Sequence, residues 1–371
     1  MSKLNDKINV ILFGGIMVFG LASTLLVPDK EFSEIENRTL AQKPAFTLEN
    51  FMSGNLDDET EKYLSDQFIL RDSCVTLKSS TEALLGKKEF NGSYLTDNML
   101  LERMDEPTEQ FNTNITAVNN ASNALGVPLS LALVPTATDV YKDTLPNGAP
   151  TANQQKLLST ISQNLNSDVN MINMSAIMHE HKDEYIYYRT DHHWTSLGAY
   201  YGAKTLLESM GYQIAPLEDF NIQMVTEDFN GTLYSSSGVR SVTPDSIDIY
   251  VEQGNTYVES WRNGSPEQGS LYDFSYLDKK DKYSMFLGGN QPLAILKTGN
   301  EGGKLLLVRD SYADSLVPFL IPYFSEIHLF DARYFKQPLS TYVNSQNIDN
   351  VVMLFSLKNF LTDTNLTMIC K

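Results

Sequence analysis

The sequence predicts an α/β protein with a central parallel sheet, joined at its amino-terminal side to a helix that spans a membrane. Two patterns carry this prediction. One is a long uncharged apolar run near the start of the chain, and the other is a later series of short apolar runs that alternate with helical patterns. A chain of 371 residues with 11% aromatic side chains can bury a full core, which excludes a disordered protein.

The amino-terminal run, residues 8–27, reads INVILFGGIMVFGLASTLLV and contains no charge. At ~1.5 Å per residue it is roughly 30 Å long, the thickness of the hydrocarbon core of a bilayer. Lys3 and Lys7 precede it, so the positive-inside rule keeps residues 1–7 in the cytoplasm and places the rest outside. We predict a single-pass anchor in the cell membrane. A cleaved signal peptide, which would release a secreted domain, is the alternative, and a buried helix of a cytosolic protein is a third.

Two further regions follow the anchor. Residues 28–88 are polar and helical in pattern, with Tyr63 and Phe68 on one face, and we interpret them as a helical connector. Residues 89–371 are expected to form the α/β domain. Within that domain, residues 216–297 are rich in Gly, Ser, Thr and Tyr, and we interpret them as a β-rich insertion.

The alternation of strands and helices defines the fold class. The short apolar runs expected to be buried strands are residues 129–134, 169–172, 305–308, 327–330 and 351–355. The helical patterns are residues 153–165, 196–210 and 313–318. Short buried strands separated by helices indicate parallel pairing with crossover helices, and hence a sheet covered on both faces.

Charge and cysteine content exclude several functions. The chain has 28 Lys and Arg against 46 Asp and Glu, a net charge of −18. A nucleic-acid backbone would be repelled by that balance, whereas a neutral glycan would not. Cys74 and Cys370 are too few for a disulfide framework or a cysteine-rich zinc site, and whether they pair is open.

The first candidate for chemistry is the segment Arg189-Thr-Asp-His-His-Trp-Thr195, between a strand-like run and the helix that begins near Ser196. Loops of this kind carry the sites of parallel-sheet proteins. Asp191, two residues before His193, can orient one imidazole nitrogen and stabilise the imidazolium when His193 accepts a proton. The alternative is a capping role at the helix start, with Thr195 or Ser196 as the cap.

The second candidate is Ser311, because the apolar strand at residues 305–308 runs into Arg309-Asp310-Ser311 and a helical stretch follows at once. A strand–turn–helix context places a serine hydroxyl at the carboxyl edge of the sheet, with backbone N–H groups facing a developing oxyanion. A simple N-cap is the alternative. A third candidate is Phe286-Leu-Gly-Gly-Asn290, where the glycines allow close backbone approach, Gly289 among them, and Asn290 can donate to an oxyanion. A plain turn is its alternative.

Metal catalysis is the weaker interpretation of the histidines. His179 and His181 together with Asp191, His192 and His193 would supply enough ligands for zinc or for a two-metal phosphoesterase. His179 and His181 lie in a charged run that indicates a solvated surface. We therefore expect neither a metal nor a cofactor.

These segments resemble the DHHW protein family of bacterial exported proteins, which is similar to the alginate O-acetyltransferases of the SGNH-hydrolase-like group. The segments that carry the resemblance are Phe32–Ala41, Asp66–Asp72, Leu133–Tyr141, Thr190–Thr195, Phe229–Leu233, Phe286–Asn290 and Asp310–Tyr312. The resemblance implies an SGNH-hydrolase-like three-layer fold. It also implies that Ser311 is the nucleophile, His193 the general base and Asp191 its orienting carboxylate, with His192 a bystander.

The remaining site residues also follow from the resemblance. The Ser311 N–H and Asn290 are the expected oxyanion donors, with Gly289, Arg309 and Tyr312 as further oxyanion or substrate positions. The chain departs from the group at two places. Arg309 stands where SGNH enzymes typically have Gly before Asp-Ser, and Thr136 or Ala137 stands where the family usually has lysine.

The resemblance implies an extracytoplasmic serine-dependent O-acetyltransferase or acetylesterase that acts on cell-surface polysaccharide. A membrane-bound partner would supply acetyl groups from the cytoplasm. The alternative is a catalytically silent SGNH-like protein that binds glycan or acts as a scaffold in the cell envelope, which Arg309 favours.

Overall fold

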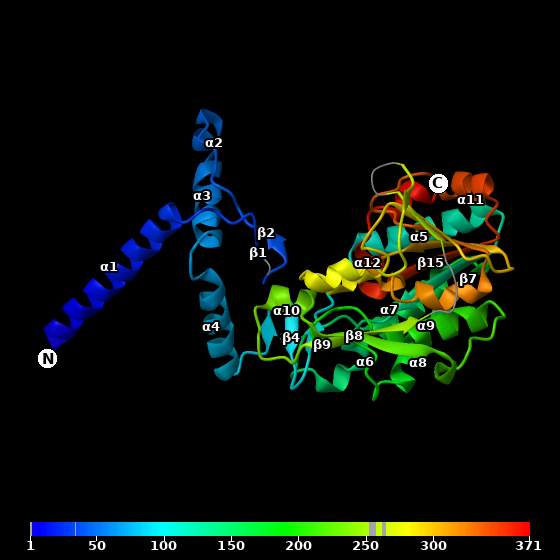
Figure 1. Ribbon diagram of the computed structural model, residues 1–371, viewed down its shortest axis with the longest axis horizontal. Coiled ribbons are helices and arrows are strands. Elements are labelled where there is room, and N and C mark those ends of the chain that lie inside the picture. Colours follow the sequence, from blue (N-terminus) through cyan, green and yellow to red (C-terminus); the bar gives the residue numbers. More distant parts are fainter. Residues whose placement is uncertain (1, 34, 252–256, 262–264) are drawn as a thin grey trace. The chain divides into compact units, whose positions relative to one another are not determined.

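The computed structural model describes residues 2–33, 35–251, 257–261 and 265–371 (Figure 1). Contacts divide the chain into two compact units. The first comprises residues 1–90 and 235–241, and the second comprises residues 91–234 and 242–371.

The first unit begins with the long helix α1 (Ser2–Leu26). Its stretch Lys7–Thr24 is long and apolar enough to cross a membrane, a test that a signal sequence also passes. Apolar side chains along it are largely exposed, including Val10, Ile11 and Phe13. Such exposure costs free energy in water and none in lipid, so it favours contact of this helix with lipid.

The region that we interpret as a connector, residues 28–88, is mostly helical. After the short antiparallel pair β1 (Phe32–Ser33) and β2 (Arg38–Thr39), its elements are α2 (Leu48–Ser53), α3 (Asn55–Asp66), α4 (Arg71–Leu84) and β3 (Glu89–Phe90). The Asp66 carboxylate at the end of α3 accepts hydrogen bonds from Arg38 at 2.9 and 2.5 Å and from the Ala41 N–H at 2.9 Å. The Arg38 bonds above all lower the pKa of Asp66 to about 2. This pairing ties two of the resembling segments together.

The second unit is built on a mixed, mostly parallel sheet. Within the described residues it has eight strands in the order β11-β10-β12-β14-β13-β15-β6-β7. The parallel strands are β14 (Glu326–Phe330), β13 (Lys304–Arg309), β15 (Asn350–Ser356), β6 (Leu129–Val134) and β7 (Val169–Asn173). The antiparallel strands β12 (Leu293–Lys297), β10 (Tyr257–Ser260) and β11 (Glu267–Gln268) complete one side.

Helices cover both faces of this sheet. The α-helices are α5 (Glu109–Leu125), α6 (Ala137–Val140), α7 (Gln154–Asn164), α8 (Ser175–Glu180), α9 (Ser196–Ser209), α11 (Leu339–Gln346), α12 (Leu357–Thr362) and α13 (Leu366–Ile369). The 3-10 helices are η1 (Lys142–Thr144), η2 (Leu217–Asp219), η3 (Phe274–Asp278), η4 (Lys282–Met285), η5 (Ser311–Ala313) and η6 (Val317–Tyr323). Helices α9 and η6 share a buried cluster with one face, and α5, α7 and α11 to α13 share one with the other.

The two connections around β13 leave on opposite faces. Alternate side chains of β13 point to the two clusters, Leu307 to the first and Val308 to the second. The connection after β13 packs on the first face through η6, whereas the connection after β14 packs on the second face through α11. Strand β13 therefore lies between its two successors in the sheet, with their crossovers on different sides.

The five expected strands are present, and the remaining elements differ in detail. The helical pattern at residues 313–318 forms 3-10 turns, η5 and the start of η6, because Pro318 and Pro322 lack the N–H that an α-helix needs. Of residues 216–297, β8 (Asn221–Phe229) and β9 (Asp245–Val251) pair with each other. Strands β10, β11 and β12 instead extend the main sheet. Helix α10 (Thr232–Ser237) and the pair β4 (Ser93–Leu95) and β5 (Leu100–Glu102) complete the described elements.

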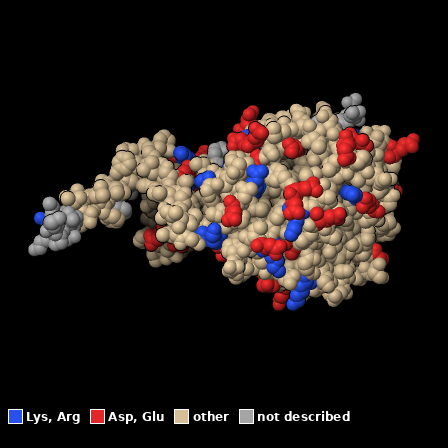
Figure 2. All heavy atoms as spheres, turned by 90° about the horizontal axis from the view of Figure 1, so that it is seen from below, with Lys and Arg blue, Asp and Glu red and all other residues tan. Residues whose placement is uncertain are grey.

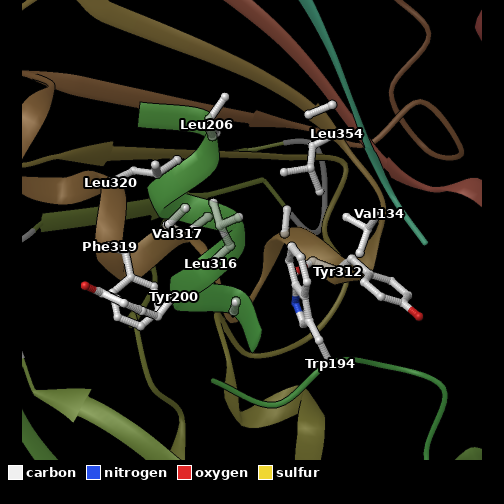
Figure 3. Close-up of a cluster of buried hydrophobic side chains, with 14 of the residues drawn as sticks. Val134, Trp194, Tyr200, Leu206, Tyr312, Leu316, Val317, Phe319, Leu320 and Leu354 are labelled. Atoms are coloured by element: carbon white, nitrogen blue, oxygen red, sulfur yellow. The ribbon is translucent and has the colours of Figure 1, made fainter. Parts of the chain in front are cut away.

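Trp194 joins the loop before α9 to the turn after β13. Its indole is fully buried beside Tyr312 in the first cluster (Figure 3). The indole N–H donates to the Tyr312 carbonyl at 2.9 Å, and Ser315 Oγ lies 3.1 Å away. A Cβ on Gly202 of α9 would lie 2.6 Å from the indole, so only glycine lets the helix approach so closely.

We predict that Gly202→Ala destabilises the second unit by about 1–3 kcal/mol, because the new methyl group must displace Trp194. On an exposed helical face the same change would stabilise by up to about 1 kcal/mol. Thermal and urea unfolding of the full chain in detergent measure the effect. Glu208→Ala, on the exposed side of the same helix, is the control and should leave the transition within about 0.5 kcal/mol. An unchanged transition in Gly202→Ala would show that the close approach does not constrain the fold.

Candidate active site

The loop from Arg189 to Thr195 has a defined shape set by backbone bonds at its base. The Tyr188 N–H donates to the His193 carbonyl at 3.2 Å, and the Thr195 N–H donates to the Ile186 carbonyl at 3.0 Å. Thr195 is the N-cap of α9, since its hydroxyl accepts from the Gly198 N–H. The capping role considered from the sequence is therefore present. It belongs to Thr195 and leaves the side chains of Asp191 and His193 available.

A buried carboxylate on β9 holds the first half of this loop. Asp245 accepts hydrogen bonds from the Arg189 N–H and the Thr190 N–H, both at 2.8 Å, and from the hydroxyls of Thr190 and Tyr185. Burial raises the pKa of Asp245, while these bonds favour its ionised form. Nothing in the sequence pattern marks Asp245, because it lies 55 residues after Thr190 in a segment without recognisable periodicity.

Asp191, His193 and Ser311 form one continuous hydrogen-bonded chain. His193 Nδ1 lies 2.6 Å from Asp191 Oδ1, and His193 Nε2 lies 2.7 Å from Ser311 Oγ. Because the carboxylate can only accept, Nδ1 carries the proton and Nε2 accepts from the serine hydroxyl. Asp191 and His193 are buried, whereas Ser311 is partly exposed. A serine in contact with a neutral imidazole, and open to solvent on one side, is placed to be deprotonated as it attacks a ligand.

The buried charge of Asp191 is held by several donors. Its Oδ1 also accepts from the His193 N–H at 3.0 Å, and its Oδ2 accepts from the Thr232 N–H and hydroxyl at 2.7 and 3.0 Å. Burial would raise the pKa of Asp191, but the adjacent histidines and these bonds outweigh it and lower the pKa well below the usual range. A Cβ on Gly231 would lie 2.3 Å from the Asp191 Cβ. Gly231 and Thr232 belong to the segment Phe229–Leu233, so this resembling segment contacts Asp191 directly.

Two opposing effects act on the pKa of His193. Burial lowers its pKa, but the charge of Asp191 and the hydrogen bond to it more than compensate, so the pKa of His193 is raised. His192 has a lowered pKa, chiefly through burial and then through the charge of His193. The His192 Nδ1 lies 2.7 Å from Thr232 Oγ1 and its ring has no recorded bond to Ser311 among the described residues.

Asp310 shapes the turn that presents Ser311. Its Oδ1 accepts from the Tyr312 N–H at 3.0 Å, which caps η5. Its Oδ2 accepts from the Ser356 N–H at 2.9 Å and from the Asn359 side chain at 2.7 Å. One carboxylate thus joins the carboxyl ends of β13 and β15. The Ser311 N–H has no partner in the described part of the chain and can donate to a ligand oxygen.

Tyr283, which the sequence did not single out, contacts both His193 and Ser311. Its ring stacks on the His193 imidazole with centroids 3.9 Å apart and planes 7° from parallel. Its hydroxyl donates to the Ser311 carbonyl at 2.9 Å and lies 3.1 Å from Ser315 Oγ. Burial raises the pKa of Tyr283 well above its ordinary value, so the hydroxyl remains a donor. A single tyrosine in a polar segment without periodicity gives no signal by which this contact could have been found.

The other expected oxyanion and substrate residues lie around this centre with different partners. Tyr312 is buried, and its hydroxyl donates to the His192 carbonyl. The Gly289 N–H donates to the Phe286 carbonyl at 3.2 Å, so the turn itself uses it. Arg309 is buried and pairs with Asp314 at 2.9 Å and with Asn290 Oδ1 at 3.2 Å. Asn290 is exposed, and with its oxygen so occupied it retains its amide N–H groups as donors.

Among the described residues, Asp191, His192 and His193 form a group whose possible ligand atoms lie within 4.8 Å of one another. His179 and His181 are not part of it. Their recorded partners are Ser175 and Asp139 for His179, and Glu184 and Tyr201 for His181. Both ring nitrogens of His193 are already bonded, so metal binding would have to break the chain to Ser311. The donor set fits proton transfer better than a metal.

Comparison with solved structures places the fold among known proteins. A DHHW family protein from Eubacterium siraeum has a similar crystal structure, with 25% identity, a TM-score of 0.66 and coverage of 76% of this chain and 95% of that one. Bacillus cereus PatB1 with a sulfonyl adduct is 19% identical with a TM-score of 0.64, over 74% of this chain and 97% of that one. The O-acetyltransferase domain of Pseudomonas putida AlgJ is 17% identical with a TM-score of 0.45, over 74% and 94%.

No curated protein matches this sequence significantly. The family model described as DHHW protein matches residues 111–330, which is more than half of the chain. The matched span contains Asp191 and His193 with the indole that anchors their loop, and also Tyr283 and Ser311. The family that the sequence resembles is therefore confirmed, and this chain belongs to the DHHW protein family.

Proposed function

We propose that this protein is an extracytoplasmic serine-dependent O-acetyltransferase or acetylesterase that acts on cell-surface polysaccharide. The hydrogen-bonded chain from Asp191 through His193 to Ser311 is the observation that carries the proposal. We propose an acetyl group and a glycan as the reactants because the family is similar to the alginate O-acetyltransferases. We also propose that the mixed α/β unit is SGNH-hydrolase-like in its three-layer architecture.

The first half of the proposed reaction acetylates the serine. Ser311 Oγ attacks the carbonyl carbon of an acetyl ester while His193 Nε2 takes its proton. The carbonyl oxygen becomes an oxyanion that accepts from the Ser311 N–H and, in our proposal, from the Asn290 amide. The tetrahedral intermediate collapses, the bond to the donor alcohol breaks, and His193 returns the proton to that alcohol.

The second half moves the acetyl group to an acceptor. A sugar hydroxyl attacks the acetyl carbonyl of acetyl-Ser311 while His193 takes the hydroxyl proton. The ester bond to Ser311 breaks, and His193 protonates Ser311 Oγ. Water in place of the sugar makes the same steps an esterase reaction. Asp191 holds the imidazole in the tautomer that both halves need and stabilises the imidazolium between them.

The membrane helix and the acetyl supply are part of the same proposal. Helix α1 would anchor the protein in the cell membrane, with residues 1–7 in the cytoplasm and the connector and α/β domain outside. An uncleaved anchor would keep the site near the bilayer, where a membrane-bound partner could deliver acetyl groups. A cleaved helix would release the same domain.

The competing interpretation is a silent protein that binds glycan or acts as a scaffold. A separation of Ser311 and His193 too long for side-chain rotation to close would favour it. The observed contact of 2.7 Å favours the enzyme instead. Arg309, the residue that favoured the silent protein, is buried in an ion pair with Asp314.

The serine mechanism predicts a specific pattern of activity loss. Ser311→Ala and His193→Ala should each lower the hydrolysis of p-nitrophenyl acetate by the full chain in detergent by about 10³-fold or more. His192→Ala should retain most of the activity, because His192 has no recorded bond to Ser311. Activity that survives Ser311→Ala would end the serine mechanism.

The raised pKa of His193 predicts the pH dependence. The base form is neutral, so kcat/KM should rise with pH through an apparent pKa above 6.5. Asp191→Asn removes the charge that raises it, so the inflection should move to lower pH while the plateau falls by about 10³–10⁴-fold. A pH–rate profile of both forms measures the two effects. An inflection that stays in place or moves upward would contradict the assigned pairing.

Tyr283 should affect rate and pKa through separate parts of its side chain. Tyr283→Phe keeps the stacked ring and loses the bond to the Ser311 carbonyl, about 1 kcal/mol, so kcat should fall roughly fivefold with the pH inflection unchanged. Tyr283→Leu also removes the ring face that favours the imidazolium, so the inflection should move to lower pH. Identical pH profiles for the two variants would show that the stacking does not act on His193.

A further inference from the structure

A polar cavity lies at the carboxyl ends of three neighbouring parallel strands. Its volume is about 220 Å³, and it lies in the second unit. Its walls come from the residues that end or follow β13, β14 and β15, among them Arg309, Asp310, Asp331, Arg333, Phe355 and Asn359. Ser311 leaves the same end of β13, directly after two of these residues.

The topology explains why a cavity forms there. β13 lies between β14 and β15 in the sheet, and the connections that follow β13 and β14 pack on opposite faces. Where successive crossovers diverge in this way, the chain leaves a crevice outside the carboxyl ends of the strands, and α/β proteins bind ligands in such crevices. Location alone thus makes the cavity a candidate for a ligand.

The carboxylates that line the cavity are already satisfied. Asp310 accepts from Tyr312, Ser356 and Asn359. Asp331 accepts from the Arg333 backbone at 3.0 Å and from its guanidinium at 2.9 and 2.6 Å. Asp363 accepts from the N–H groups of Asn365 and Leu366. The acceptors of the wall are therefore used by the protein itself.

The unused hydrogen-bonding capacity belongs to donors. Arg309 is 2% exposed, and its Nε has no hydrogen-bond partner. A buried donor left in this state costs about 1–3 kcal/mol unless a ligand satisfies it. Arg333 uses Nε and Nη2 on Asp331 and Asn290, and its Nη1 has no partner in the described part of the chain. Both arginines line the cavity, so their guanidinium groups are the donors that we consider for a ligand rich in acceptors.

Charge decides between an anionic and a neutral ligand. Each guanidinium is balanced by its own carboxylate, Asp314 for Arg309 and Asp331 for Arg333. Asp310 and Asp363 add further negative charge. On the face that Figure 2 draws, acidic groups likewise lie among the basic ones. A phosphate or carboxylate would gain little here, whereas hydroxyl and ring oxygens accept from guanidinium without bringing charge.

We propose that this cavity is the acceptor subsite and binds one neutral sugar residue of the glycan. The volume equals that of roughly seven liquid waters at about 30 Å³ each, a space suited to a single sugar ring. This inference rests on the proposed function, because the bound residue would hold a neighbouring hydroxyl near Ser311. Arg333, exposed at the rim, would donate to the oxygens of the ring, and the buried Nε of Arg309 would donate to the deepest oxygen.

Binding tests the proposal without catalysis. The full chain carrying Ser311→Ala, in detergent, is titrated with cellotetraose, chitotetraose and tetragalacturonate, and binding is followed by calorimetry and saturation-transfer NMR. We expect a neutral tetrasaccharide to bind with a millimolar Kd and the acidic one to bind more weakly. Adding Arg333→Gln should weaken binding roughly 5–10-fold, the loss of one or two hydrogen bonds. Thr364→Trp, at an exposed wall position, should block it.

Lys304→Gln is the matched control. It removes a cation from a surface pair with Glu326 at the opposite end of β13 and should leave binding unchanged. The proposal is overturned if neither neutral tetrasaccharide binds at about 20 mM, if Arg333→Gln and Thr364→Trp both bind like the parent, or if tetragalacturonate binds best. If the neutral tetrasaccharide binds but the wild-type protein shows no serine-dependent hydrolysis, the proposed function is refuted and the subsite is not. If the wild-type protein shows serine-dependent hydrolysis but no tetrasaccharide binds, the subsite is refuted and the proposed function is not.

Discussion

The contact between His193 Nε2 and Ser311 Oγ is the constraint on which the site depends, because it joins residues 118 positions apart. A shift of either loop by about 1 Å would break this hydrogen bond. Three further bonds cross between the same loops or clamp them from outside. The Trp194 indole donates to the Tyr312 carbonyl, the Tyr312 hydroxyl donates to the His192 carbonyl, and the Tyr283 hydroxyl donates to the Ser311 carbonyl. The aromatic residues of the site therefore hold the two loops in place as well as filling the core.

Buried carboxylates hold the backbone of the site loops in place. Asp245, Asp191 and Asp310 each accept from at least two backbone N–H groups of the site loops. An ionised carboxylate in the interior is tolerated only when donors surround it, so each one selects a loop conformation that supplies them. Part of the acidic excess of this chain is thus internal and structural.

Much of this arrangement could be predicted from sequence, and the limit has a physical reason. The strands at residues 129–134 and 351–355 were predictable because buried parallel strands are continuous apolar runs. Asp191, His193 and Ser311 were identifiable because each lies on a loop beside such an element. Tyr283 and Asp245 were not, since they act from a segment whose strands are short, antiparallel or irregular. Their roles depend on tertiary contacts that no local pattern encodes.

Arg309 shows how a departure from the expected pattern can be accommodated. Where a glycine was expected, the side chain continues the alternation of β13 and enters the interior, where Asp314 balances its charge. Burial is the main reason that the pKa of Asp314 is raised to about 7, and the charges of Arg309 and His193 oppose it. The ionised form of Asp314 in turn helps to raise the pKa of His193. Through Asn290 Oδ1, the same guanidinium is linked to Arg333 at the cavity rim. One buried cation thereby connects the environment of the proposed base to the wall of the proposed sugar subsite, so this arginine couples two parts of one site.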